Sequence, residues 1–154
     1  MASYFLDSSA VIKLYQPEDG STTIERIMSE VDAQRFISRL TLVEVQRALA
    51  RRLRTQEISA QELDELRRGF YEDLLRRRFR VKELTALHYR SAVRLVRQYA
   101  PQRAVPLLRS LDALQLAVAL EVRQQHGLDY FVAADGDLCK VAKAEQLSVM
   151  NPAP

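Results

Sequence analysis

The stretch Tyr4-Phe5-Leu6-Asp7-Ser8-Ser9-Ala10-Val11-Ile12 places a carboxylate directly after a short apolar run. The run Tyr4 to Leu6 predicts a strand, and the residues from Ser8 onward have a helical pattern. In open α/β sheets, functional side chains gather beyond the carboxyl ends of the strands, which is the predicted position of Asp7. The structural alternative is that Asp7 only caps the helix that starts near Ser8.

The same alternation of a short apolar run and a helical pattern continues along the chain. Further strands are expected at Phe36 to Ser38, Val81 to Leu84, Tyr130 to Ala133 and Ser148 to Met150. The longest helices are expected at Leu42 to Arg54, Ala60 to Phe79, Leu87 to Tyr99 and Leu111 to Gln125. Ser59 is a candidate cap for the second of these helices, and Gly127 a stop for the last. The alternation predicts an α/β fold with a mainly parallel central sheet of four or five short strands flanked by helices.

Length and composition set the broad class of protein. A chain of 154 residues has the usual size of one domain, so we expect a single domain over residues 1–154. Cys139 is the only cysteine, which excludes an intrachain disulfide and fits a reducing compartment, and we expect it to be a core residue. No apolar run approaches the roughly 20 residues that span a bilayer. We therefore expect a soluble, cytoplasmic protein.

Charge gives a weaker indication of the partner. The chain has 23 Lys and Arg against 20 Asp and Glu, and its net charge of +3 favours an anionic partner only slightly. Arginines cluster at Arg51 to Arg54, Arg67 to Arg68 and Arg76 to Arg80, where guanidinium groups could bind phosphates. Acidic residues are interleaved among them, which favours a solvated helix face instead.

Three further acids occupy positions comparable to that of Asp7. Asp135 follows the strand predicted at Tyr130, Glu44 comes shortly after the strand predicted at Phe36, and Asp112 stands at the entrance of an apolar helix. Each has a structural alternative: Thr41 to Glu44 has the spacing of a capping box, Asp112 suits a helix dipole, and Asp135 or Asp137 could close a turn at Gly136. Four acids at equivalent ends of strands and helices can nevertheless converge on one point.

Such convergence has a chemical requirement. Two carboxylates about 4 Å apart repel by about 4 kcal/mol at an effective dielectric of about 20, so a group of four needs protons or cations. An oxygen-only site suits Mg²⁺ or Mn²⁺ better than zinc, and such ions activate water and stabilise a leaving oxygen in phosphodiester hydrolysis. His88 and His126 are more simply structural or solvated, and no glycine-rich phosphate loop is present.

The four acids resemble the acidic motifs of the PIN domain family. The matching segments are Phe5-Leu6-Asp7-Ser8-Ser9, Leu42-Val43-Glu44-Val45, Leu111-Asp112-Ala113-Leu114-Gln115-Leu116-Ala117 and Val132-Ala133-Ala134-Asp135-Gly136-Asp137-Leu138. The closing segment Leu147 to Pro152 resembles that family's final strand, so the resemblance covers essentially the whole chain. It implies a PIN-like fold with Asp7, Asp112 and Asp135 as metal ligands and Glu44 holding a metal-bound water or a second ion.

The short format is similar to the VapC-type toxins of toxin–antitoxin pairs. This resemblance implies a Mg²⁺- or Mn²⁺-dependent endoribonuclease that acts on RNA, forms a homodimer and is inhibited by a small cognate antitoxin protein. The chain departs from the family in having Ala133 where many relatives carry Ser or Thr. Asp137 is therefore an additional candidate metal ligand, with a helix cap as its alternative.

Two other functions remain open from the sequence. A phosphatase with Asp7 as nucleophile generally has a second Asp two residues later, where this chain has Ser9. A noncatalytic PIN-like protein- or RNA-binding module would use the fold without the chemistry. Apolar residues recur at helical spacing between Ala60 and Phe79, which indicates either a self-association or antitoxin surface or a part of the core.

Overall fold

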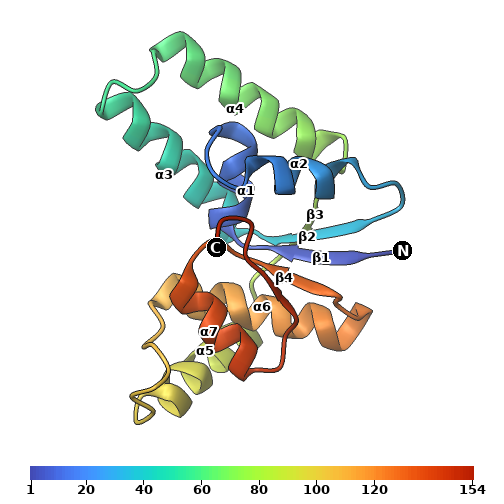
Figure 1. The fold of residues 1–154 in the computed structure, drawn as a ribbon, viewed down its shortest axis with the longest axis vertical. Coiled ribbons are helices and arrows are strands. Elements are labelled where there is room, and N and C mark those ends of the chain that lie inside the picture. Colours follow the sequence, from blue (N-terminus) through green and yellow to red (C-terminus); the bar gives the residue numbers. More distant parts are fainter.

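The computed structural model describes residues 1–154 as a five-stranded parallel sheet between two layers of helices (Figure 1). The strands are β1 (Ser3–Leu6), β2 (Gln34–Ser38), β3 (Arg80–Lys82), β4 (Tyr130–Val132) and β5 (Val149–Met150). The helices are α1 (Ser8–Tyr15), α2 (Ser21–Ser29), α3 (Leu40–Arg54), α4 (Ala60–Leu75), α5 (Ala86–Tyr99), α6 (Ser110–His126) and α7 (Gly136–Ala144). No helix combines the length and the apolar character needed to cross a membrane.

The strand order positions the carboxyl ends of β1 and β4 side by side. The order in the sheet is β3-β2-β1-β4-β5, so the chain builds outward from β1 in one direction and then returns to build in the other. Leu6 pairs with Val132, and the backbone N–H of Asp7 donates to the Val132 carbonyl at 2.9 Å. Such a reversal of strand order is the usual place for a functional crevice in open α/β sheets.

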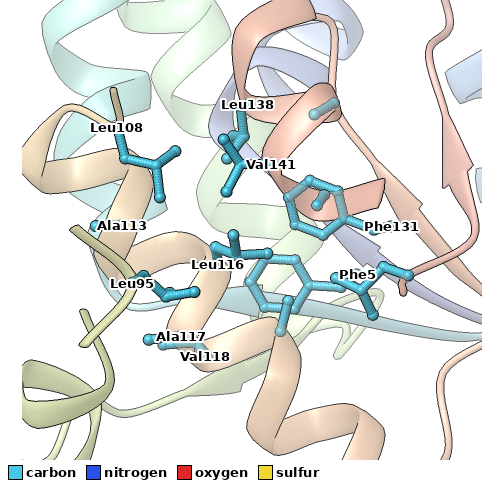
Figure 2. Packing of buried hydrophobic residues seen from close by; sticks show 14 of the residues in the cluster. Phe5, Leu95, Leu108, Ala113, Leu116, Ala117, Val118, Phe131, Leu138 and Val141 are labelled. Atoms are coloured by element: carbon cyan, nitrogen blue, oxygen red, sulfur yellow. The ribbon is translucent and has the colours of Figure 1, made fainter. Parts of the chain in front are cut away.

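Successive side chains of a strand point to opposite faces of the sheet, and here a hydrophobic core lies on each face. Tyr4 and Leu6 pack with α1 to α4, whereas Phe5, between them, packs with α5 to α7. Figure 2 shows the second core, where the rings of Phe5 and Phe131 lie stacked beside Leu116 of α6, with 5.8 Å between the ring centroids. The two helical layers are therefore consequences of period-two apolar patterns in the central strands.

Most predicted elements are confirmed, with one clear error. The helix predicted to reach Phe79 ends at Leu75. Arg77 then adopts the left-handed conformation, with a φ of 53°, which glycine adopts more readily than residues with a side chain. The amides of Arg77 and Arg78 donate to the carbonyls of Leu74 and Asp73, which closes the helix end. Strand β3 follows this helix end. It starts at Arg80 and ends at Lys82, two residues before Leu84, the predicted end of the strand.

Other sequence expectations are confirmed in detail. Ser59 caps α4 through a full capping box with Glu62, and Cys139 is buried. The apolar residues of α4 fall into two groups, buried and exposed. Leu63 and Phe70 lie in the core, whereas Leu75 is exposed. The core interpretation of this helix is therefore right for its central residues.

Candidate active site

A cavity of about 790 Å³ lies beyond the carboxyl ends of β1 and β4. Four acids from four separate parts of the chain line it: Asp7, Glu44, Asp112 and Asp135. Asp7 follows β1, Glu44 lies in α3, Asp112 in the first turn of α6, and Asp135 immediately before α7. The structure therefore brings the four acids to one cavity, as the sequence led us to expect.

Asp7 is the most buried of these acids, with only 4% of its surface exposed. Its carboxylate accepts hydrogen bonds from the N–H and the hydroxyl of Ser9, at 3.1 and 2.6 Å, so it also caps α1. The pKa of Asp7 is raised to about 6: burial is the main cause, the hydrogen bonds from Ser9 act in the opposite direction, and the negative charges of Glu44 and Asp112 add to the rise. No basic side chain forms an ion pair with Asp7. Its charge therefore lacks a partner within the protein.

Glu44 is held by a buried amide. Gln115 of α6 is fully buried, and its Nε2 donates to Glu44 Oε1 at 2.9 Å. The same nitrogen lies 2.8 Å from Ser8 Oγ and 3.2 Å from Thr41 Oγ1, while Gln115 Oε1 accepts from Ser38 Oγ at 2.8 Å. One side chain thus connects α6 with α1, α3 and the end of β2, beneath the cavity.

The beginning of α3 differs from the capping box suggested by Thr41 and Glu44. The helix starts at Leu40, with Arg39 at the N-cap in a helical conformation and without a side-chain cap. Thr41 is inside the helix and directs its hydroxyl to Ser8, at 3.1 Å, and to Gln115. The capping-box alternative is wrong because both side chains are used by the polar group beneath the cavity.

Arg109 forms ion pairs with the other two acids, Asp112 and Asp135. Its Nε donates to Asp112 and its Nη2 to Asp135, both at 2.8 Å. The hydrogen bond to Asp112 and the two negative charges raise the pKa of the guanidinium. The Arg109 side chain is 76% exposed, compared with 15% for Asp112 and 26% for Asp135. Asp135 also caps α7, with its other oxygen accepting from the amides of Asp137 and Leu138.

Asp137 does not line the cavity. Its side chain is 73% exposed and its nearest cation is Lys140, at 3.9 Å. It lies in the first turn of α7, where a negative charge favours the helix dipole, while the capping hydrogen bonds are made by Asp135. The structure thus separates Asp137 from the four acids with which it was grouped.

The histidines are also outside this cavity. His88 is buried, accepts from the Thr85 amide through Nδ1 and places Nε2 2.7 Å from Glu121. His126 stacks on Phe36 with 5.3 Å between the ring centroids. Their structural interpretation is therefore supported, and no nitrogen ligand enters the candidate site.

The chemistry of the acids fits a divalent cation, although they are not arranged as a preformed metal cage. No three Asp, Glu, His or Cys side chains are close enough together to hold one metal ion. Asp7 and Glu44 nevertheless lack a cationic partner, and all four acids offer oxygen ligands to one cavity. Hard divalent ions such as Mg²⁺ and Mn²⁺ prefer this ligand set. In this structure the carboxylates of Asp112 and Asp135 are both ion-paired with Arg109.

Arginines of α3 line the same cavity. They are Arg47, Arg51 and Arg52, and Arg52 is paired with Glu57 at 3.2 Å. Arg47 and Arg51 are exposed and form no ion pair. Within the cluster Arg51 to Arg54, the expected balance by an acidic residue therefore holds for Arg52 but not for Arg51.

Sequence reasoning assigned no functional role to Ser9, Arg109 or Gln115. Gln115 carried a signal, because it is a polar residue within an otherwise apolar helical segment and its amide needs partners when buried. Ser9 Oγ also accepts from the Ala134 amide at 3.0 Å, which connects the ends of β1 and β4. Nothing in the local sequence indicated that Arg109 would reach Asp135.

Comparisons with known proteins agree with this architecture. A family model described as PIN domain matches residues 4–144. Ribonuclease VapC45 and Ribonuclease VapC49, from two strains of Mycobacterium tuberculosis, are each 35% identical over 122 residues, which cover 79% of this chain and 78% of theirs.

Solved structures share the fold at lower sequence identity. FitAcB from Neisseria gonorrhoeae has a TM-score of 0.67 and 17% identity, with 97% of each chain covered. VapC20 from Mycobacterium tuberculosis, described as a sarcin-ricin loop cleaving toxin, has a TM-score of 0.65 and 19% identity, with 97% of this chain and 99% of that chain covered. A toxin-antitoxin complex from Klebsiella pneumoniae has a TM-score of 0.62 and 17% identity, with 97% of each chain covered.

Proposed function

Because this chain belongs to the PIN domain family, we propose that it is a divalent-metal-dependent endoribonuclease and the toxin of a type II toxin–antitoxin pair. The observation that carries the proposal is the cavity in which four acids from distant parts of the chain meet beside unpaired arginines. The names of the VapC relatives support RNA as the substrate class.

The roles of the side chains follow from their positions. Asp7, Asp112 and Asp135 would hold Mg²⁺ or Mn²⁺, and Glu44, fixed by Gln115, would orient the attacking water and accept its proton. The bound ion would lower the pKa of water and stabilise charge on the phosphate. Arg47 and Arg51 would bind phosphates of the RNA strand and bring the scissile bond to the acids. Unstacked RNA suits this arrangement, because its phosphates reach the acids without melting of a duplex.

The first test is RNA cleavage that depends on the added ion. We expect Mg²⁺ or Mn²⁺ to support hydrolysis of single-stranded or looped RNA and EDTA to abolish it. Asp112→Asn should reduce the rate at least about a hundredfold, since even changes in residues that support metal ligands cost about 10–100-fold. Asp64→Asn, which alters an exposed acid of α4, is the matched control and should cleave normally.

Two results would contradict the mechanism. Cleavage unchanged in EDTA would exclude the metal, and equal activity of the Asp112 and Asp64 variants would exclude the acids of the cavity. Absence of cleavage from varied RNA pools with either ion would favour a noncatalytic binding module.

A small antitoxin protein and a second copy of the chain are the proposed partners. The toxin–antitoxin complex among the structures with this fold supports the first. Exposed apolar side chains on the α3–α4 pair, including Val43, Tyr71 and Leu75, offer an apolar contact surface. Co-expression with a short neighbouring reading frame should relieve growth arrest caused by this protein, and sedimentation should show a dimer; growth arrest that no neighbouring protein relieves would argue against the antitoxin.

A further inference from the structure

We propose that Arg109 is a displaceable cation of this site: it neutralises Asp112 and Asp135 in the metal-free chain and binds an RNA phosphate once a divalent ion has taken those carboxylates. The inference deepens the proposed function and rests on it. It gives a role to the residue that sequence reasoning did not select, and it explains why the acids lie in one cavity without forming a metal cage.

Arg109 is ion-paired with Asp112 and Asp135, the same carboxylates that a bound metal would use as ligands. Its guanidinium contacts Oδ2 of both Asp112 and Asp135, and the backbone amides use only Oδ1 of Asp135. A cation that binds these two carboxylates therefore competes directly with Arg109. The competition leaves the cap of α7 intact, because that cap uses the other oxygen.

The position of Arg109 allows it to leave. The side chain is largely exposed, so its release uncovers no core residue. Its backbone is the extended N-cap residue before α6, and the side chain makes no capping hydrogen bond. The guanidinium can consequently change partners without disturbing the helix that carries Asp112 and Gln115.

A released guanidinium would remain at the cavity with a suitable second partner. Arg109 lines the cavity together with Arg47 and Arg51, which have no acidic partners. A guanidinium presents paired N–H donors that match two oxygens of a phosphate as well as those of carboxylates. Removing Arg109 should thus have opposite effects on two ligands: tighter binding of the metal and weaker binding of RNA.

Metal binding is measured first, without RNA, by titrating Mn²⁺ and detecting the free ion by electron paramagnetic resonance. Arg109→Ala should bind Mn²⁺ about fivefold more tightly than wild type, because two exposed ion pairs no longer compete. Arg109→Lys should fall between them, since a lysine provides a point charge without the forked donors. Arg103→Ala, which removes an unpaired exposed arginine from the loop before α6, should match wild type.

RNA binding is measured next, by fluorescence anisotropy of a labelled single-stranded RNA of random sequence at saturating Mn²⁺. All proteins carry Glu44→Gln to suppress cleavage. Arg109→Ala should weaken binding about tenfold, as expected for one charge-assisted contact. It should also reduce the slope of log affinity against log salt by about 0.7, corresponding to one lost phosphate contact. Arg103→Ala should change neither quantity.

The outcomes separate this inference from the proposed function. Equal or weaker Mn²⁺ binding by Arg109→Ala, or no Mn²⁺ binding by either protein, would overturn the competition. An RNA affinity equal to that of the Arg103 control would overturn the phosphate contact. Tighter Mn²⁺ binding by Arg109→Ala in a protein whose wild type cuts no RNA would support the competition while refuting the nuclease.

Discussion

Replacing Asp7 by Asn should stabilise the metal-free protein at pH 7 and abolish its RNA cleavage. Asp7 is buried without a cationic partner, and its pKa in the folded chain is about 6 rather than 3.8. Ionisation of the folded state at neutral pH therefore opposes folding, by up to about 3 kcal/mol for a pKa difference of about two. Asn removes the charge and keeps an oxygen that can accept from the amide of Ser9. Urea unfolding in EDTA measures the gain.

The pH dependence has a definite sign. Between about pH 4 and pH 6 the folded state retains the Asp7 proton more strongly than the unfolded state, so the contribution of this group to stability falls as pH rises. The advantage of Asp7→Asn should be small at pH 4 and should level off above pH 6. Added Mn²⁺ should then stabilise wild type more than the variant. A variant less stable than wild type in EDTA at pH 7 would show that the cap outweighs the buried charge.

Asp129→Asn is a control for which the opposite change in stability is expected. Hydrogen bonds from the amide and hydroxyl of Ser3 lower the pKa of this exposed acid. Its ionised form is therefore favoured by folding, and Asp129→Asn should reduce stability at neutral pH. The same unfolding measurements distinguish the two acids.

Replacing Gln115 by Leu should destabilise the fold by about 2–4 kcal/mol, because it removes a buried amide from several polar partners. Ser8, Thr41 and Ser38 are buried, and Leu can satisfy none of their hydroxyls. Cleavage should also fall, since Glu44 loses the donor that orients it. Urea unfolding and RNA cleavage provide the two measurements.

Gln124→Leu is the matched control for this change. It makes the same substitution on the exposed side of α6, where surface replacements usually alter stability by no more than about 0.5 kcal/mol. A Gln115 variant as stable and active as this control would show that the buried amide neither supports the core nor positions Glu44.

The fold followed from patterns that are local in sequence. The apolar run before Asp7 predicted β1, and periodicity predicted α3, α5 and α6 to within a few residues. The end of α4 could not be predicted in this way. Its stop is a left-handed arginine in a run of good helix formers, without the glycine or proline that usually indicates a helix end.

The candidate site was predictable in its charges but not in its contacts. Asp7 and Asp135 stood out because each follows a strand, and a parallel sheet places such residues at one edge. The Arg109–Asp135 pair joins residues that are distant in sequence, through a flexible side chain that obeys no periodicity. Thr41 had the spacing of a cap, but tertiary contacts with Ser8 and Gln115 determined its hydrogen bonds.

The strand order also bears on how the protein is synthesised. Asp7 and Glu44 lie in the first third of the chain, whereas Asp112 and Asp135 lie in the last third. A ribosome that has translated through α5 has produced three strands, but β1 still lacks its neighbour β4 and the cavity lacks half of its acids. A polypeptide whose translation stops before β4 therefore lacks Asp135 and carries no complete site. The proposed nuclease therefore arises only once β4 and Asp135 have been made and β4 has paired with β1.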